Sequence, residues 1–125
     1  MPQEIEIIAQ NVQVEAELND GPTAKSIISI LPIEALAQRW GGEIYFSVSA
    51  KGELEAGSRD VLEAGDLGYW PPGRAFCIFF VPTPASTAEE IRPASPVNVF
   101  GRVVGDARVL KQVRNGDEVM VKRAP

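Results

Sequence analysis

The stretch AFCIFFV, residues 75–81, is the longest continuous apolar run in the chain. A strand with one face in water alternates apolar and polar residues, whereas a strand covered on both faces is apolar throughout. We therefore expect residues 75–81 to form a central strand that is buried on both sides or seals a barrel. The run is far shorter than the roughly 20 apolar residues that a membrane-spanning helix needs.

Strand signals continue on both sides of this run. Upstream, residues 43–50 alternate polar and apolar side chains, which places the two sets on opposite faces of a strand. Residues 61–70 have strand and turn character, and the Pro-Pro-Gly sequence at 71–73 is a strong turn signal. Downstream, residues 82–96 contain four prolines and predict a long irregular connection, of a kind that often carries function. Another strand is predicted at 97–104.

The two ends of the chain add further strands. Residues 4–18 alternate polar and apolar side chains on both sides of Gln10-Asn11, which predicts a β-hairpin with its glutamates in water. Near the other end, the turn signal Asn115-Gly116 precedes a last strand at 119–122.

Two helices are predicted between the strands. Pro22 suits a first helical turn, and apolar residues recur at helical spacing over 24–31, just before a proline. The Gly-Asp pair at 105–106 predicts a turn and an N-cap for a short helix through Val113. Residues 33–40 stay open, because their spacing fits a helix but the segment is short and follows a proline.

About eight strands and two helices in one domain, residues 1–125, favour a closed β-barrel capped by helices. A chain of 125 residues is long enough to bury a core without disulfide support. Hydrophobic residues make up 45% and charged residues 23%, as is ordinary for a globular protein in water.

The composition excludes several kinds of site. There is no histidine and only one cysteine, so a Ser-His-Asp triad, a Cys-His pair, an intrachain disulfide and a Cys/His zinc site are all ruled out. The cysteine, Cys77, lies inside the apolar run and is expected to be a buried, inert thiol. Nucleotide-binding glycine motifs and metal-binding spacings are missing, so no cofactor and no metal are expected.

The formal net charge of −5 argues against a nucleic-acid partner, and nothing in the sequence indicates a membrane partner. The N-terminus lacks the features of a signal peptide, so we expect a soluble cytoplasmic protein. The charge is uneven: residues 1–91 carry 5 basic and 14 acidic side chains, and residues 92–125 carry 7 and 3. The basic residues of 92–125 are either dispersed over the surface or form a local anion-binding patch. If there is such a patch, the first place to expect it is near Arg92 and Arg102.

Aromatic residues gather near turns. Tyr69 and Trp70 stand directly before the rigid turn at 71–73. Tyrosine and tryptophan carry polar atoms that need partners, so they favour rims and pockets over deep cores. Two interpretations stay open: these rings stack on a ligand or a proline-containing peptide, or they close the ends of the barrel.

Three long motifs, WGGEIYFS at 40–47, GDLGYWPPG at 65–73 and PASPVNVFGR at 93–102, give the chain its most specific character. They resemble the signatures of a small prokaryotic family of uncharacterised proteins with an atypical cyclophilin-like fold. The resemblance runs from the first strand to the last. It implies a closed eight-stranded antiparallel barrel with two short capping helices, in which residues 33–40 run as a strand.

The resemblance to cyclophilins implies less about activity than about fold, because one fold can host many functions. Cyclophilins isomerise X–Pro bonds with a guanidinium beside an apolar, aromatic pocket. Their Phe-His-Arg and Gln-Gly-Gly-Asp strings are absent here, and residues 82–96 contain neither the tryptophan nor the histidine of that pocket. Arg39 and Arg74 are the arginines nearest to aromatic-rich turns and are the candidates to replace the missing one.

The favoured hypothesis is a non-catalytic module that binds a small ligand or a peptide in a groove. The candidate ligand-binding residues are Glu43, Tyr45, Tyr69, Trp70, Arg74 and Asn98. The alternatives are a weak or divergent prolyl isomerase and a structural or interaction subunit, for which a homodimer is one form. The sequence leaves enzymatic activity open.

Overall fold

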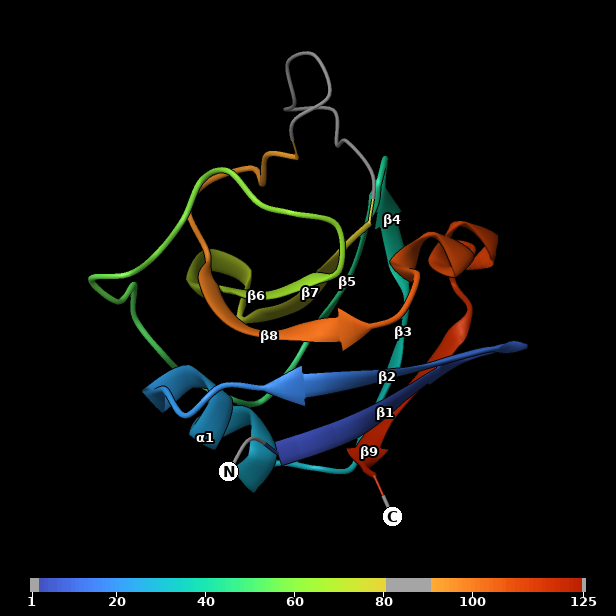
Figure 1. The fold of residues 1–125 in the computed structure, drawn as a ribbon, viewed down its shortest axis with the longest axis horizontal. Coiled ribbons are helices and arrows are strands. Elements are labelled where there is room, and N and C mark those ends of the chain that lie inside the picture. Colours follow the sequence, from blue (N-terminus) through green and yellow to red (C-terminus); the bar gives the residue numbers. More distant parts are fainter. Residues whose placement is uncertain (1–2, 81–90, 125) are drawn as a thin grey trace.

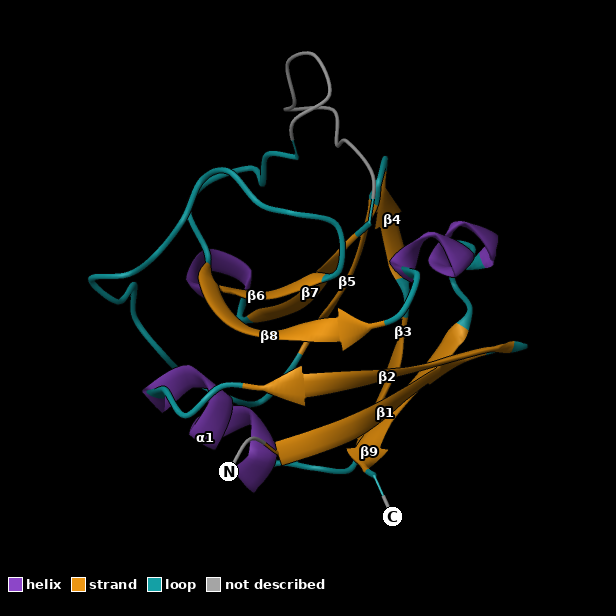
Figure 2. Ribbon diagram, viewed as in Figure 1, coloured by secondary structure: helices purple, strands orange, loops and turns teal. Residues whose placement is uncertain are grey.

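One antiparallel sheet curls round most of the protein in the computed structural model, which describes residues 3–80 and 91–124 (Figures 1 and 2). Its nine strands lie in the order β3-β9-β1-β2-β8-β6-β7-β5-β4. Their bounds are β1 (Gln3–Ala9), β2 (Val12–Leu18), β3 (Ile33–Leu36), β4 (Gln38–Trp40), β5 (Glu43–Ser47), β6 (Asp66–Trp70), β7 (Ala75–Phe79), β8 (Asn98–Val104) and β9 (Glu118–Arg123). The mainly β, antiparallel prediction is confirmed.

The barrel is nearly closed by one bent segment. The two outermost strands of the sheet, β3 and β4, are consecutive in the chain, and β3 pairs with β9 while β4 pairs with β5. Ala37 separates them because its N–H donates to Asp117 O and its carbonyl accepts from Gly116 N, both at 2.7 Å. The predicted count of eight closed strands is therefore corrected to nine in a nearly closed barrel. The strand expected at 33–40 is confirmed as this pair, so helical spacing was misleading there.

Within residues 3–80 and 91–124, three short helices connect the strands: α1 (Pro22–Ser29), η1 (Pro71–Gly73) and η2 (Ala107–Gln112). Of these three, α1 is an α-helix and the other two are 3₁₀ helices. The second predicted helix is confirmed as η2, which Asp106 caps by accepting from Arg108 N at 3.0 Å. In Figure 1, α1 and η2 lie near opposite ends of β2. None of the helices in the described ranges is long and apolar enough to cross a membrane.

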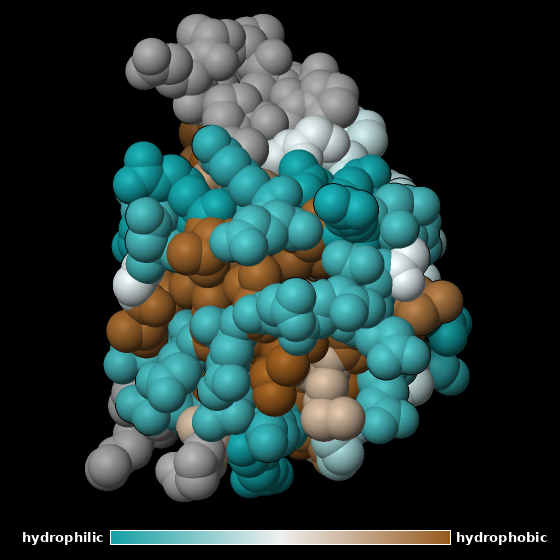
Figure 3. Space-filling model, turned by 90° about the vertical axis from the view of Figure 1, so that its right-hand side faces the viewer, coloured by the Kyte–Doolittle hydropathy of each residue, from teal (hydrophilic) through white to brown (hydrophobic). Residues whose placement is uncertain are grey.

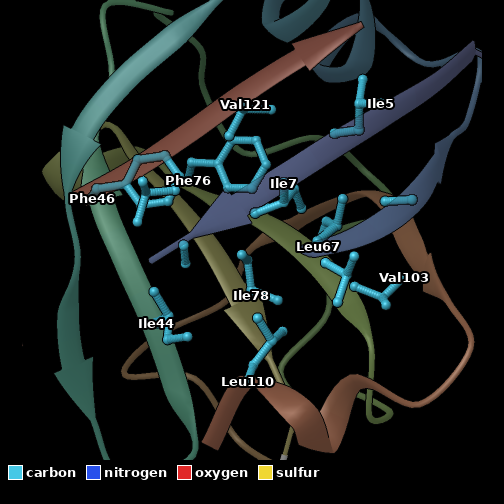
Figure 4. Close-up of a cluster of buried hydrophobic side chains, with 14 of the residues drawn as sticks. Ile5, Ile7, Ile44, Phe46, Leu67, Phe76, Ile78, Val103, Leu110 and Val121 are labelled. Atoms are coloured by element: carbon cyan, nitrogen blue, oxygen red, sulfur yellow. The ribbon is translucent and has the colours of Figure 1, made fainter. Parts of the chain in front are cut away.

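The inside of the barrel is filled by side chains (Figure 4). Alternate residues of the strands point inward and meet there, among them Ile7, Ile78 and Val121. The Phe76 ring stacks on Phe46 and meets Phe100 edge-on, with both pairs of ring centroids 5.0 Å apart. Each such buried side chain contributes about 1.5–3 kcal/mol through its removal from water. The core consequently leaves ligand sites to the ends and the outside of the barrel.

A second, smaller core explains why the run that begins at Ala75 is apolar on both faces. All five residues of β7 are buried: Phe76 and Ile78 face the barrel, while Ala75, Cys77 and Phe79 pack outward. Two chain segments cover this outer face, because Arg59 bridges to Val97 and Leu62 bridges to Ile91. The predicted central strand and buried thiol are confirmed. Val81 and residues 82–90 of the predicted connection lie outside the described residues.

Candidate functional site

The six candidate side chains from the sequence lie on different faces and at different ends of the sheet. Two of them, Tyr69 and Asn98, are buried on neighbouring strands near the α1 end of the barrel. Tyr45 and Trp70 pack against the outer core, and Glu43 lies on the outer face with Tyr45. Arg74 is exposed just after η1, in the left-handed conformation with φ of 47°. The six do not line one groove, and a ligand role for them stays a prediction.

Tyr69 belongs to the barrel core. Its ring is 1% exposed, and its hydroxyl donates a hydrogen bond to the Ala50 carbonyl at 2.8 Å. Burial raises the pKa of this phenol above its ordinary value. The polar atom is thus satisfied inside the protein, as expected for a ring that closes a barrel end.

Asn98 ties three parts of the chain together at the same end. Its side-chain oxygen accepts from Glu55 N at 2.8 Å, and its amide donates to Glu53 O at 2.9 Å and to Thr23 Oγ1 at 3.2 Å. The Thr23 hydroxyl donates in turn to the Glu55 carboxylate. Asn98 therefore fixes α1 and the loop at 53–55 to β8.

Trp70 joins two of the long motifs. Its indole N–H donates to Ser95 Oγ at 2.6 Å, so the motif at 65–73 contacts the motif at 93–102. A Cβ at Gly73 would lie 2.9 Å from the indole ring, which explains why glycine stands there. These unusual strings therefore encode local packing around the outer core.

Glu43 is the selected carboxylate whose pKa is shifted. Its side chain is buried on the outer face of β5, and burial raises its pKa to about 7, against a smaller lowering by a hydrogen bond with Cys77. Burial, together with the charge of Glu43, raises the pKa of the Cys77 thiol well above its ordinary value. The thiol stays protonated, so it is no nucleophile.

Arg92 and Arg102, where an anion was first expected, lie beside carboxylates. The Arg102 guanidinium contacts Glu63 at 2.9 Å, and that of Arg92 lies 3.8 Å from Asp60. An anion at either arginine would have to compete with these acids.

A polar hollow of about 810 Å³ opens at the other end of the barrel. It lies between the β1–β2 turn at Gln10 and Asn11, Arg39 of β4, and the segment 111–117, which begins with the last two residues of η2. Sequence reasoning did not predict this hollow, because its walls come from three distant parts of the chain. The basic character of residues 92–125 was the one signal that pointed toward it.

Cations dominate the hollow. Arg39, Lys111 and Arg114 line it, and Asp117 is the one acidic residue among the lining residues. No salt bridge joins any of these three cations to a carboxylate in the described ranges, whereas Arg102, Arg108 and Lys122 each have such a partner. The Asp117 carboxylate already accepts a hydrogen bond from Arg114 N at 2.7 Å. The hollow thus collects positive charge in a chain of net charge −5.

Arg39 holds the walls of the hollow together. Its Nη1 donates to the carbonyls of Lys111 at 3.1 Å and Val113 at 2.7 Å, and its Nη2 donates to Gly41 O at 2.8 Å. The guanidinium also lies over the Phe80 ring, 5.1 Å from its centroid. Arg39 is therefore a positioning residue, which joins β4 to the C-terminal end of η2 and contributes charge.

The described residues offer no site for a metal ion, since no group of three or more cysteine or acidic side chains has a suitable arrangement within these ranges. Nothing in the geometry of the hollow calls for a cofactor.

Comparison with known proteins agrees with this architecture. The model of the cyclophilin-like family matches residues 3–122, and the chain belongs to that family. The solution structure of the hypothetical protein AF2241 from Archaeoglobus fulgidus is similar, with 44% sequence identity and a TM-score of 0.83. The alignment covers 98% of this chain and 95% of the archaeal one. Among curated proteins no match is found.

Proposed function

We propose that this protein is a non-catalytic binding module that holds a small anionic ligand in the polar hollow at the η2 end of the barrel. The observation that carries the proposal is the concentration around one concavity of Arg39, Lys111 and Arg114, which form no salt bridge within the described ranges. Its volume of about 810 Å³ lies within the range of small-molecule sites, roughly 300–1,000 Å³.

The walls of the hollow are held in place before any ligand arrives. Arg39 bonds to two carbonyls of the segment 111–113, and its backbone N–H donates to the Asn115 side chain at 3.3 Å. On the opposite wall, Gln10 N donates to Glu118 O at 3.3 Å. A preformed site loses little conformational entropy on binding, which favours affinity.

The test is a ligand screen by amide NMR chemical shifts, with inorganic phosphate, acetate and citrate as probes. We expect shifts at residues 10–12, 39 and 111–117, and about tenfold weaker binding by the double variant Lys111→Ala/Arg114→Ala, because two unpaired cations are lost. The matched control is Lys25→Ala/Arg123→Ala, which removes two exposed cations elsewhere. Shifts outside the hollow, or equal weakening by both double variants, would reject the proposal.

Prolyl isomerase activity is the second candidate, and family membership favours it. The positions of the two candidate arginines favour it less. The Arg39 guanidinium donates its hydrogen bonds to backbone carbonyls, and Arg74 is exposed beside η1. Binding of a proline-containing peptide and a role as a homodimer or interaction subunit also stay predictions, which peptide titration and native mass measurement decide.

A further inference from the structure

A second hollow, of about 650 Å³, adjoins the cationic one and has a different character. It lies on the outer face of β1, β9 and β3, where the register places Ile8 beside Met120 and Leu36 beside Glu118. Leu36 is 60% exposed, the highest exposed fraction among the large hydrophobic residues of the described ranges. Figure 3 views the molecule from the side where Figure 1 draws β3, β4 and η2, and it shows hydrophobic residues gathered at the centre with hydrophilic ones around them.

The two hollows adjoin each other at the β1–β2 turn. Gln10 lines both of them, and it is held to β9 by its backbone bond to Glu118. A molecule seated against Lys111 and Arg114 that extends past Gln10 therefore reaches the apolar strip of Ile8, Met120 and Leu36.

The charges differ between the two hollows. The cations belong to the first, whereas the apolar strip is flanked by two acids, Glu34 and Glu118. A negative group is attracted to the first hollow and repelled from the second, and an uncharged chain gains by covering the strip. The ligand that fits both hollows has one anionic end and one uncharged apolar end.

We infer that the ligand is a small amphiphilic anion, whose head group lies in the cationic hollow and whose short unbranched tail lies on the outer face of β1, β9 and β3. This inference rests on the proposed function, since it assigns the head group to the same hollow. Neighbouring strands are about 4.8 Å apart, so the strip from β1 to β3 spans about 10 Å, which suits a tail of several methylenes.

The test compares acetate, butanoate, hexanoate and octanoate by amide NMR titration, with 1-hexanol as the uncharged probe. We expect acetate to shift the cationic hollow alone, and octanoate to shift residues 8, 36 and 120 as well. Each added methylene that contacts the strip should tighten binding about two- to fourfold. Hexanol should bind more weakly than hexanoate, because it lacks the charge.

Two variants separate the tail from the head. Leu36→Ser should abolish most of the chain-length dependence and leave acetate binding unchanged, whereas Lys111→Ala/Arg114→Ala should weaken all the carboxylates. Val104→Ser is the matched control, since Val104 is likewise an exposed hydrophobic strand residue, 52% exposed, but lies outside both hollows.

The outcomes distinguish this inference from the proposed function. Acetate binding in the cationic hollow without chain-length dependence would overturn the amphiphile and leave the proposed function standing. Failure of every anion to shift the cationic hollow would overturn both. Shifts at residues 8, 36 and 120 that depend on protein concentration alone would mean that a second copy covers the strip, and would also overturn the inference.

Discussion

At the scale of single residues, Glu43 is a carboxylic acid whose protonation differs from that of a free side chain. It lies opposite Phe79 in the β5–β7 ladder and hydrogen-bonds to Cys77, on a face that water hardly reaches. Burial disfavours the carboxylate form, which is why the pKa rises from the ordinary 4.5 to about 7. The folded protein therefore holds a proton on Glu43 that the unfolded chain releases.

The stability consequence has a definite sign. The pKa of Glu43 is about 7 in the folded protein and 4.5 in the unfolded chain. Because of this difference, Glu43 lowers the free energy of unfolding as pH rises from 4.5 to 7. Above pH 7 the destabilisation by the buried carboxylate is complete. Glu43→Gln should remove this cost and raise the free energy of unfolding at pH 8 by on the order of 2–3 kcal/mol, with little gain near pH 4.5. Urea denaturation across this pH range measures it.

Glu34→Gln serves as the control, because Glu34 is an exposed carboxylate on β3. If the free energy of unfolding of both glutamine variants has the same pH dependence as that of the original protein, the pKa of Glu43 is not elevated.

At the scale of elements, η2 depends on tertiary contacts for its position. It is a 3₁₀ helix of six residues, and the hydrogen bonds within such a helix stabilise it only weakly. Three anchors compensate: Leu110 and Val113 are buried in the barrel core, and Arg39 binds the carbonyls at its C-terminal end. The geometry of the cationic hollow consequently depends on one guanidinium from β4.

Arg39→Lys should therefore loosen η2 although the charge is kept. A lysine ammonium cannot reproduce the planar guanidinium group, which donates to the carbonyls of Gly41, Lys111 and Val113 at the same time. We expect faster hydrogen exchange at the amides of residues 113–117 and a loss of stability on the order of 1–3 kcal/mol.

Amides in the β6–β7 ladder should keep their protection and serve as the internal reference. Unchanged exchange at 113–117 in Arg39→Lys would show that Arg39 does not hold this segment.

At the scale of the whole molecule, the protein keeps the cyclophilin-like barrel while covering the outer face of β7. The segments around Leu62, Ile91 and Val97 bury Cys77 and Phe79 there. The aromatic side chains Tyr45 and Trp70 pack against this cover. Within the described residues, these two rings therefore contribute to the packing of the outer core.

A protease-coupled assay on X–Pro peptides should accordingly show no acceleration over the uncatalysed rate, which reflects a barrier of about 18–20 kcal/mol. Stabilising the twisted amide requires a guanidinium that is available to the substrate, and Arg39 is engaged with the backbone. Acceleration that is lost in Arg74→Ala but kept in Lys25→Ala would contradict this prediction and identify Arg74 as the catalytic group.

The sequence by itself determined most of the strands, because alternation and continuous apolar runs record locally which faces of each strand are buried; residues 33–40, whose spacing fits a helix, are the exception. It predicted β7, the first hairpin and the barrel class, and the long motifs carried the resemblance to the family. It missed the break at Ala37, since the bonds that interrupt the strand come from residues 116 and 117, far along the chain.

Only the tertiary structure decided where a ligand site lies. The candidate residues were chosen by residue type, and type does not say whether Tyr69 or Asn98 points to solvent or into the barrel. The cationic hollow joins the turn at Gln10 to Arg39 and the segment 111–117, and no local pattern records that these parts meet. Periodicity is a property of neighbouring residues, whereas a binding site is a property of distant residues that closure of the sheet brings together.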